Sequence, residues 1–370
     1  MIQDASDPSA FDAEYLGMRL LVLPGDGIGP EITSATLEVL SAASERFGLG
    51  IEFVEDVVGH TSLERYGTTV RSELLDRVHE VDGLVLGPVA TNDFKDEQRG
   101  EINPSMYFRK HLDLFANIRP CRTYPGLVSR SGDFDLVVVR ENTEGFYADR
   151  NMEQGSGEIL VTADVAISLR RITRWCCQRI AHAAFELARQ RNNHVSIVHK
   201  ANVLKIGDGM FIDECRKVAQ EYSGVTVDDF IVDAMMAHVV RAPERFDVIV
   251  TTNMFGDILS DLTAELAGSL GLGSSLNAGA DYAMAQAAHG SAPDIAGRNI
   301  ANPFSLILST SLLIAWHGRR VSNPLYEQAA AAIDQALEEA VIAREITTDL
   351  GGSLGTHECG QALARRVLTR

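Results

Sequence analysis

The sequence predicts an α/β protein with a largely parallel sheet. Over nearly the whole chain of 370 residues, short apolar runs alternate with runs of helical periodicity, as expected when helices connect parallel strands. Seven of the apolar runs have the length of buried strands. They lie at residues 20–23, 51–57, 83–86, 136–139, 195–198, 225–232 and 248–251.

Three segments carry apolar residues at helical spacing. In residues 30–47 the apolar stripe consists of Ile32, Ala35, Val39, Ala43 and Phe47. Pro30 suits the first turn of this helix, where its missing N–H is not needed. Residues 166–190 and 325–344 show the same periodicity, so we expect helices there as well.

Two segments resemble crossings between domains. The first is the Pro-containing stretch 117–126, and the second is the Gly/Ser-rich stretch 268–275. If both are hinges, residues 1–116 and 268–370 form one discontinuous domain. Residues 117–267 then form a central second domain.

Composition excludes some classes of partner. With 45% hydrophobic and 23% charged residues, the chain has the composition of an ordinary globular protein. A net charge of −18 argues against binding to nucleic acid or to an anionic membrane, because both require a basic face. Residues 1–14 lack an apolar signal core, and the five cysteines show no C-x-x-C spacing. We therefore expect a cytoplasmic protein with free thiols.

Two aspartates suggest a metal site. Asp257 and Asp261 follow the strand at 248–251 in the segment NMFGDILSD. Their i, i+4 spacing on a helix places them about 6 Å apart on one face, where two like charges repel unless a cation lies between them. Oxygen ligands suit Mg²⁺ or Mn²⁺. The alternative is a pair of solvated surface aspartates.

Cationic side chains and a tyrosine lie where catalytic groups could be. Arg140 and Lys200 each follow an apolar strand, at the carboxyl end where α/β proteins bind ligands. Together with Arg109 and Arg119, Arg140 could grip carboxylates. Lys200 is either a solvated charge or a base, and Tyr147 is a plausible proton donor beside it or a core residue.

The glycine-rich segment LPGDGIGPE at 23–31 does not predict a Rossmann fold. Its glycines fall at positions 25, 27 and 29, which is not the G-x-G-x-x-G spacing, so a tight structural turn is at least as good an interpretation. A better nucleotide candidate is the loop at 289–297 with His289 and Asp294. A carboxylate accepts hydrogen bonds from both ribose hydroxyls but repels a 2′-phosphate, which favours NAD over NADP.

Together, six ordered motifs resemble the isocitrate/isopropylmalate dehydrogenase family of β-decarboxylating dehydrogenases. The resemblance implies a two-domain α/β fold that is not a Rossmann fold. It also implies oxidative decarboxylation of a malate-type substrate with NAD and Mg²⁺ or Mn²⁺. The motifs are LPGDGIGPE, LDLFANIRP, VRENTEGFY, HKANVLK, NMFGDILSD and HGSAPDIAG…IANP, between residues 23 and 303.

The resemblance implies roles residue by residue. Lys200 would be the base for the C2 hydroxyl, and Tyr147 would protonate the carbanion left by CO₂. The substrate-binding residues would be Arg109, Arg119, Arg140, Ser105 and Asn202. The metal ligands would be Asp233, Asp257 and Asp261, and the cofactor residues His289, Gly290, Asp294 and Asn302.

The family resemblance also implies a homodimer with shared active sites. Lys200 and Asp233 would reach each site from the neighbouring subunit. Residues 149–159 would belong to an arm that is exchanged between the subunits.

Departures from the family pattern leave the substrate open. Gln286 stands where family members usually have Glu, so one negative charge near the cofactor is lost. Asn103 and Ser105 are interchanged relative to isocitrate enzymes, and 101–108 contains no extra cation. Because an unpaired carboxylate is costly to bury, we favour a neutral or apolar C3 substituent, as in 3-isopropylmalate. Isocitrate, tartrate or D-malate activity, and a non-catalytic regulatory subunit, remain alternatives.

Overall fold

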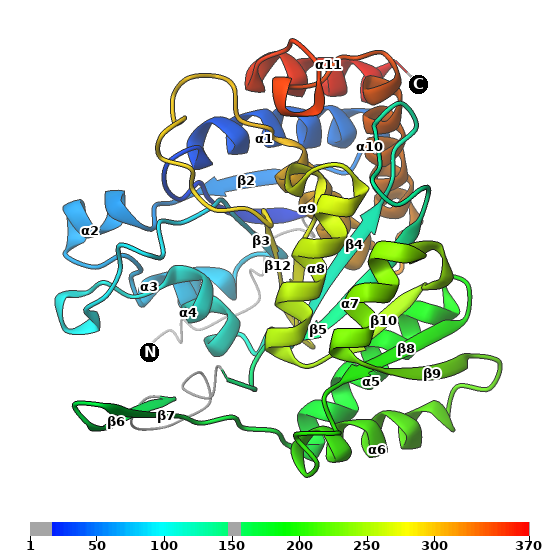
Figure 1. Cartoon of the computed structure of the whole chain (residues 1–370). Coiled ribbons are helices and arrows are strands. Elements are labelled where there is room, and N and C mark those ends of the chain that lie inside the picture. The colour runs from blue at the N-terminus through cyan, green and yellow to red at the C-terminus, as the bar shows by residue number, and fades with distance from the viewer. Residues whose placement is uncertain (1–16, 147–156, 370) are drawn as a thin grey trace, which may run out of the picture.

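The computed structural model describes residues 17–146 and 157–369, which form a large sheet covered by helices (Figure 1). The sheet has ten strands in the order β2-β1-β3-β12-β11-β4-β5-β10-β8-β9. In that order, the strands are Glu52–Glu55, Arg19–Leu23, Gly83–Leu86, Ala283–Gln286, Leu276–Ala278, Ala116–Arg122, Asp135–Glu141, Val248–Thr251, His194–His199 and Thr226–Ile231.

The sheet consists of two parallel blocks that run in opposite directions. Strands β2, β1, β3 and β12 are parallel to one another, and so are β5, β10, β8 and β9. Between the blocks, β11 and β4 make three successive antiparallel pairings. The prediction of a largely parallel sheet is thus confirmed, with an antiparallel centre that the sequence did not indicate.

The expected domain crossing at 117–126 is largely a strand. β4 occupies Ala116–Arg122 and pairs with both β5 and β11. The N- and C-terminal parts of the chain supply one half of the sheet, and the middle part supplies the other. The domain boundaries proposed from the sequence remain a prediction, because one continuous sheet runs through both parts.

Helices cover both halves of the sheet (Figure 1). In the first half, α1, α9, α10 and α11 share one core, and α3 and α4 border another. In the second half, α5 and α6 share a core, while α7 and α8 contribute to a further core. The helices α1 to α11 are Gly29–Phe47, His60–Tyr66, Glu73–Val78, Pro104–His111, Arg174–Arg189, Gly207–Ala219, Val232–Arg241, Asn253–Ala267, Phe304–Arg320, Pro324–Ile342 and Thr356–Leu368. Short 3₁₀ turns lie at Glu97–Arg99, Pro243–Arg245, Leu270–Leu272 and Thr348–Leu350.

The helices expected at 30–47 and 325–344 are confirmed as α1 and α10. The helix expected at 166–190 is wrong over its first residues. Strand β7 (Val165–Ser168) lies there, paired with β6 (Glu158–Thr162). Helix α5 begins later because Thr173 caps it, with its side chain accepting a hydrogen bond from the Cys176 N–H.

The β6–β7 hairpin is a separate two-stranded sheet that projects from the molecule (Figure 1). Every residue of its two strands is exposed. Among them are the apolar side chains of Ile159, Leu160, Val161, Val165 and Ile167. A hairpin of this kind is only marginally stable by itself in water.

The five cysteines are buried and unpaired by disulfides. In the described part of the chain, no helix combines the length and the apolar character that crossing a bilayer demands.

Candidate active site

A cleft of about 260 Å³ brings together residues from α4, β4, β5, α8, β12 and the loop after β12. Segments more than 150 residues apart in the sequence meet there, as the contact between Arg109 and Gln286 shows. Seven of the residues predicted from the sequence line the cleft. They are Ser105, Arg109, Arg119, Arg140, Asp257, His289 and Gly290.

Three arginines of the cleft are buried. Arg109, at the end of α4, is 8% exposed, Arg119 in β4 is 9% exposed, and Arg140 in β5 is 2% exposed. Burial of cations is costly unless partners are arranged around them. All three arginines line the same cleft.

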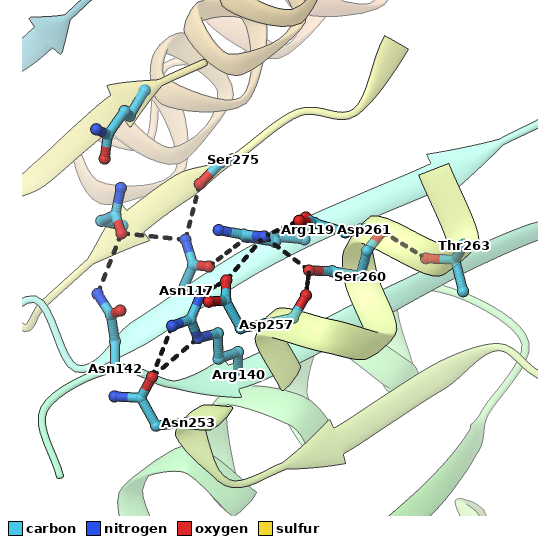
Figure 2. Close-up of polar contacts among 12 residues, drawn as sticks. Asn117, Arg119, Arg140, Asn142, Asn253, Asp257, Ser260, Asp261, Thr263 and Ser275 are labelled. Atoms are coloured by element: carbon cyan, nitrogen blue, oxygen red, sulfur yellow. Dashed lines mark hydrogen bonds and ion pairs between the residues drawn. The ribbon is translucent and has the colours of Figure 1, made fainter. Parts of the chain in front are cut away.

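Neutral oxygen atoms hold two of these guanidinium groups in place (Figure 2). Arg119 donates hydrogen bonds from Nε to Asn117 Oδ1 at 2.7 Å and from Nη1 to Ser260 Oγ at 2.7 Å. Arg140 donates from Nε and Nη2 to Asn253 Oδ1 at 3.1 and 2.7 Å. These amide and hydroxyl oxygens orient the two guanidinium groups without cancelling their charge; the Asp257 and Asp261 carboxylates offset part of it.

Asp257 and Asp261 lie on the side of α8 that faces the arginines (Figure 2). Arg119 Nη1 lies 3.4 Å from Asp257 Oδ1 and 3.1 Å from Asp261 Oδ1, and Arg140 also donates to Asp257. Partial burial raises the pKa of Asp261; Arg119 opposes this shift and Asp257 adds to it. The two carboxylates form an oxygen-only donor set, which fits a hard divalent cation.

Gln286, the position where one negative charge is lost, contacts the first arginine. Its Oε1 accepts hydrogen bonds from Ser105 Oγ at 3.0 Å and from Arg109 Nη2 at 3.0 Å. The sequence placed this residue only near the cofactor. It is a neutral partner that positions Arg109, just as Asn117 and Asn253 position the other two arginines.

The glycine-rich turn at residues 23–31 stabilises neighbouring loops. The carboxylate of Asp26 accepts hydrogen bonds from the backbone N–H groups of His60 and Ala90 at 2.8 and 2.9 Å. Ile28 N–H donates to the Ser291 carbonyl at 2.9 Å. Gly27 has φ +58°, and a Cβ there would lie 2.0 Å from that carbonyl oxygen. The turn therefore supports the loop that carries His289, as the structural interpretation of its glycines predicted.

His289 offers an acceptor that has no partner in the described chain. Its Nδ1 lies 3.1 Å from the Gly290 carbonyl oxygen, and its buried Nε2 makes no hydrogen bond to any described residue. Burial lowers the pKa of the ring, so the neutral form with its proton on Nδ1 leaves Nε2 as an acceptor. A hydroxyl or amino group of a nucleotide fits that atom.

The other two predicted cofactor residues lie outside the lining of the cleft. Asp294 is exposed, and its carboxylate is open to solvent on the loop. Asn302 is buried and already paired, because its Nδ2 donates to Asp349 at 3.0 Å and its Oδ1 accepts from Phe304 N–H at 2.9 Å. In this chain Asn302 secures the start of α9.

Lys200, Asn202 and Asp233 also lie outside the cleft lining. Lys200 follows β8 and forms an ion pair with Asp233 at the start of α7, which lowers the pKa of Asp233 through a side-chain hydrogen bond. Asn202 is exposed in the adjoining turn. Tyr147 and much of the expected exchange arm at 149–159 lie outside the described residues.

Within residues 17–146 and 157–369, no three His, Cys, Asp or Glu side chains cluster closely enough to hold a metal ion. One acidic side chain, Asp257, lines the cleft, and Asp261 lies one turn further along α8, outside the lining. The third predicted ligand, Asp233, is paired with Lys200 elsewhere.

Known proteins resemble the chain over nearly its full length. The family model for isocitrate/isopropylmalate dehydrogenase matches residues 19–363. The 3-isopropylmalate dehydrogenase of Methanothermobacter thermautotrophicus is 39% identical over 95% of this chain and 98% of its own. The isocitrate/homoisocitrate dehydrogenase of Thermus thermophilus is 39% identical over 95% of this chain and 99% of its own.

Solved structures agree with the sequence comparison. The crystal structure of isocitrate dehydrogenase from Methylococcus capsulatus superposes with a TM-score of 0.83 and 36% identity, covering 95% of this chain and 99% of that chain. The chain is thus an oxidoreductase that belongs to the isocitrate/isopropylmalate dehydrogenase family.

Proposed function

We propose that the protein catalyses the oxidative decarboxylation of a 3-substituted malate, with NAD as oxidant and Mg²⁺ or Mn²⁺ as metal ion. The observation that carries this proposal is the group of three buried arginines in one cleft, two of which form ion pairs with Asp257 or Asp261 on α8. Anionic substrate groups and a divalent cation have complementary partners there.

Substrate carboxylates bind to the guanidinium groups. Arg109, Arg119 and Arg140 are pre-oriented by Gln286, Asn117 and Asn253, respectively. Little conformational freedom is lost when the substrate arrives, and the carboxylates are held in one orientation. Ser105, on α4 near Arg109, would contact the C3 substituent.

Asp257 and Asp261 would hold the metal ion together with Asp233 of the partner subunit. When bound, the cation polarises the carbonyl formed at C2 and offsets the negative charge that appears as CO₂ departs. The arginines that now contact the aspartates keep these carboxylates facing the cleft.

Lys200 and Tyr147 would transfer the protons. Lys200 would take the proton from the C2 hydroxyl when the substrate is oxidised, and Tyr147 would return a proton to C3 after decarboxylation. His289 Nε2 and the open backbone at Gly290 would contact the cofactor, with Asp294 accepting hydrogen bonds from its ribose. Asn302 contributes by fixing the start of α9.

We further propose that the active unit is a homodimer. Lys200 and Asp233 form a preassembled pair that is absent from the lining of the cleft in their own chain, so a second copy of the chain would supply them. The exposed apolar side chains of the β6–β7 hairpin would also be buried against another protein surface. A symmetric dimer would satisfy both needs.

The C3 substituent of the substrate is inferred to be uncharged. The relatives include isopropylmalate, isocitrate and homoisocitrate dehydrogenases and do not distinguish these substrates, so the inference rests on the cleft. On the side of Arg109, the residues that line the cleft include Val89, Thr91, Asn103, Ser105 and Met106. None of these five side chains carries a positive charge that could form an ion pair with an additional carboxylate, whose burial would be costly.

A substrate panel tests this function. Purified protein with Mn²⁺ and NAD is expected to form NADH from 3-isopropylmalate. Its kcat/KM for this substrate is expected to be at least about tenfold higher than for isocitrate, homoisocitrate, D-malate or tartrate. A tenfold ratio corresponds to about 1.4 kcal/mol of transition-state stabilisation. A preference for a tricarboxylate would overturn the uncharged pocket. Absence of turnover on every substrate would instead favour the non-catalytic regulatory subunit.

Gly256→Ala is expected to raise the substrate KM about tenfold while leaving the fold intact. Gly256 in α8 packs against Arg140, and a Cβ there would lie 2.7 Å from both Cβ and Cγ of that arginine. The arginine must shift, and small misplacements of binding groups are costly. The measurement is steady-state kinetics beside Gly209→Ala, a helix position where a Cβ meets nothing within 4 Å. An unchanged KM in G256A would show that Arg140 does not bind substrate.

A further inference from the structure

A buried ion pair lies behind the loop that carries Lys200. Asp208, in the first turn of α6, is 0% exposed. Its Oδ2 accepts a hydrogen bond from the Lys200 backbone N–H at 2.5 Å, and its Oδ1 accepts one from Arg170 Nη2 at 2.6 Å. One carboxylate thus joins the backbone of the proposed base to a distant arginine.

Arg170 lies at the foot of the β6–β7 hairpin, close to segments that lead into the proposed active site. Its Nη2 is 3.3 Å from Thr252 Oγ1, directly before α8. Its guanidinium carbon is 5.8 Å from the ring centre of Phe146 and 5.8 Å from that of Phe255. Phe255 belongs to the same helix as the metal-binding aspartates, and Phe146 precedes Tyr147.

The hairpin foot is fixed by backbone contacts as well. Arg171 N–H donates to the Gly145 carbonyl at 2.9 Å, and Gly145 N–H donates to the Arg171 carbonyl at 2.8 Å. The same short segment, residues 170–171, therefore contacts the strand end that leads to Tyr147 and the carboxylate that holds Lys200. These contacts lie within one chain.

The ion pair between Asp208 and Arg170 compensates positive charge at the start of α6. Gly207, at the start of α6, lies so close to Arg170 that a Cβ would be 3.0 Å from its Nη1. The N-terminal end of a helix carries partial positive charge, which repels a guanidinium. Asp208 offsets both charges, and its removal would leave a buried cation without compensation.

We propose that Asp208 is the positioning residue for Lys200 and that, through Arg170, it ties the lysine to the foot of the hairpin. This inference rests on the role proposed above for Lys200 as base. A second side chain supports the same loop, since His199 Nδ1 accepts a hydrogen bond from Ala201 N–H at 3.1 Å. Asp208 differs from His199 because its hydrogen bond to Arg170 also links the loop to the hairpin foot and, through Arg170, to the start of α8.

If the dimer has shared sites, the link has a further consequence. Lys200 would serve the partner's cleft, whereas Thr252 precedes α8 and Phe255 belongs to it, and Asp257 of this helix lines the chain's own cleft. The Arg170–Asp208 pair would then connect elements of two active sites within one subunit.

The test is Asp208→Asn in the full-length protein, with a substrate carrying deuterium at C2. A misplaced base slows the step that transfers hydride, so kcat is expected to fall at least about tenfold, with KM changed less than about threefold. The primary isotope effect on kcat is expected to rise. The matched control is Asp213→Asn, at an exposed position of the same helix, which is expected to keep wild-type values.

The outcomes separate this inference from the proposed function. If Lys200→Met is inactive but folded D208N matches wild type in kcat and isotope effect, the positioning role is wrong and the proposed function stands. If K200M retains full activity, both the proposed base and its positioning are wrong. Should D208N not fold, Arg170→Lys replaces it. R170K keeps one charge but not the forked contact with Asp208 and Thr252, and wild-type kinetics in R170K would also overturn the inference.

Discussion

Lys200→Met is expected to lower kcat by about 10²- to 10⁴-fold, the range by which a general base accelerates a reaction. Methionine has nearly the length of lysine but cannot accept a proton. It also releases Asp233, the ion-pair partner of Lys200, and leaves the Asp208 contact intact because that contact involves the backbone. Binding of substrate with Mn²⁺, measured by calorimetry, is therefore expected to remain detectable.

The control for this variant is Lys205→Met, at an exposed lysine in the same loop. It removes the same charge near the site without removing the proposed base. Wild-type kcat in K200M, or an equal loss in K205M, would show that proton removal does not depend on Lys200.

Asp257→Asn is expected to lower kcat/KM by about 10³-fold at a fixed, low Mn²⁺ concentration and to weaken Mn²⁺ binding by a similar factor. The amide is nearly isosteric with the carboxylate but supplies no charge to balance the cation. Arg119 and Arg140 also lose the ionic partner that they share. The measurement is Mn²⁺ binding by electron paramagnetic resonance, together with kinetics across a metal titration.

The control is Glu265→Gln, which removes a charge from an exposed position on α8. It is expected to change neither kcat/KM nor the affinity for Mn²⁺. High Mn²⁺ should restore part of the D257N activity. Equal Mn²⁺ affinity in D257N and the wild type would contradict the assignment of Asp257 as a ligand.

The seven strands predicted from apolar runs are all present, and fully buried ones such as β3 and β10 are nearly continuous apolar runs, as expected for buried parallel strands. The predicted and observed bounds agree to the residue for β3 and β10. Strand β4 was missed because its buried side chains include Asn117 and Arg119, which serve the cleft instead of an apolar core. Polar residues at buried positions of a strand are a feature of functional sites.

The small strands β11 and β12 were also missed, since they have three and four residues and few large apolar side chains. Hairpin strand β7 was taken for the start of a helix, because its apolar residues continue the stripe of α5. The sequences of these short segments do not by themselves indicate strands. Their conformation depends on pairing: β11 pairs with β4, β12 with β3 and β7 with β6.

The composition of the cleft was predictable from the motifs, whereas its internal contacts were not. Residue types and spacing indicated Arg109, Arg140 and Asp257. The hydrogen bond from Arg109 to Gln286 joins residues 177 positions apart, and nothing local in the sequence indicates it. Asp208 was missed for a similar reason, because a single acidic residue in a first helical turn usually has only a capping effect.

The central claim is that each active site combines Asp257 of one chain with Lys200 of the other. The direct test is to unfold and refold equal amounts of the two inactive variants K200M and D257N together, and to measure NADH formation. Random pairing gives half heterodimers, each with one intact site, so about a quarter of wild-type activity is expected. If the mixture is no more active than either variant alone, although mass spectrometry shows heterodimers, the shared site is contradicted.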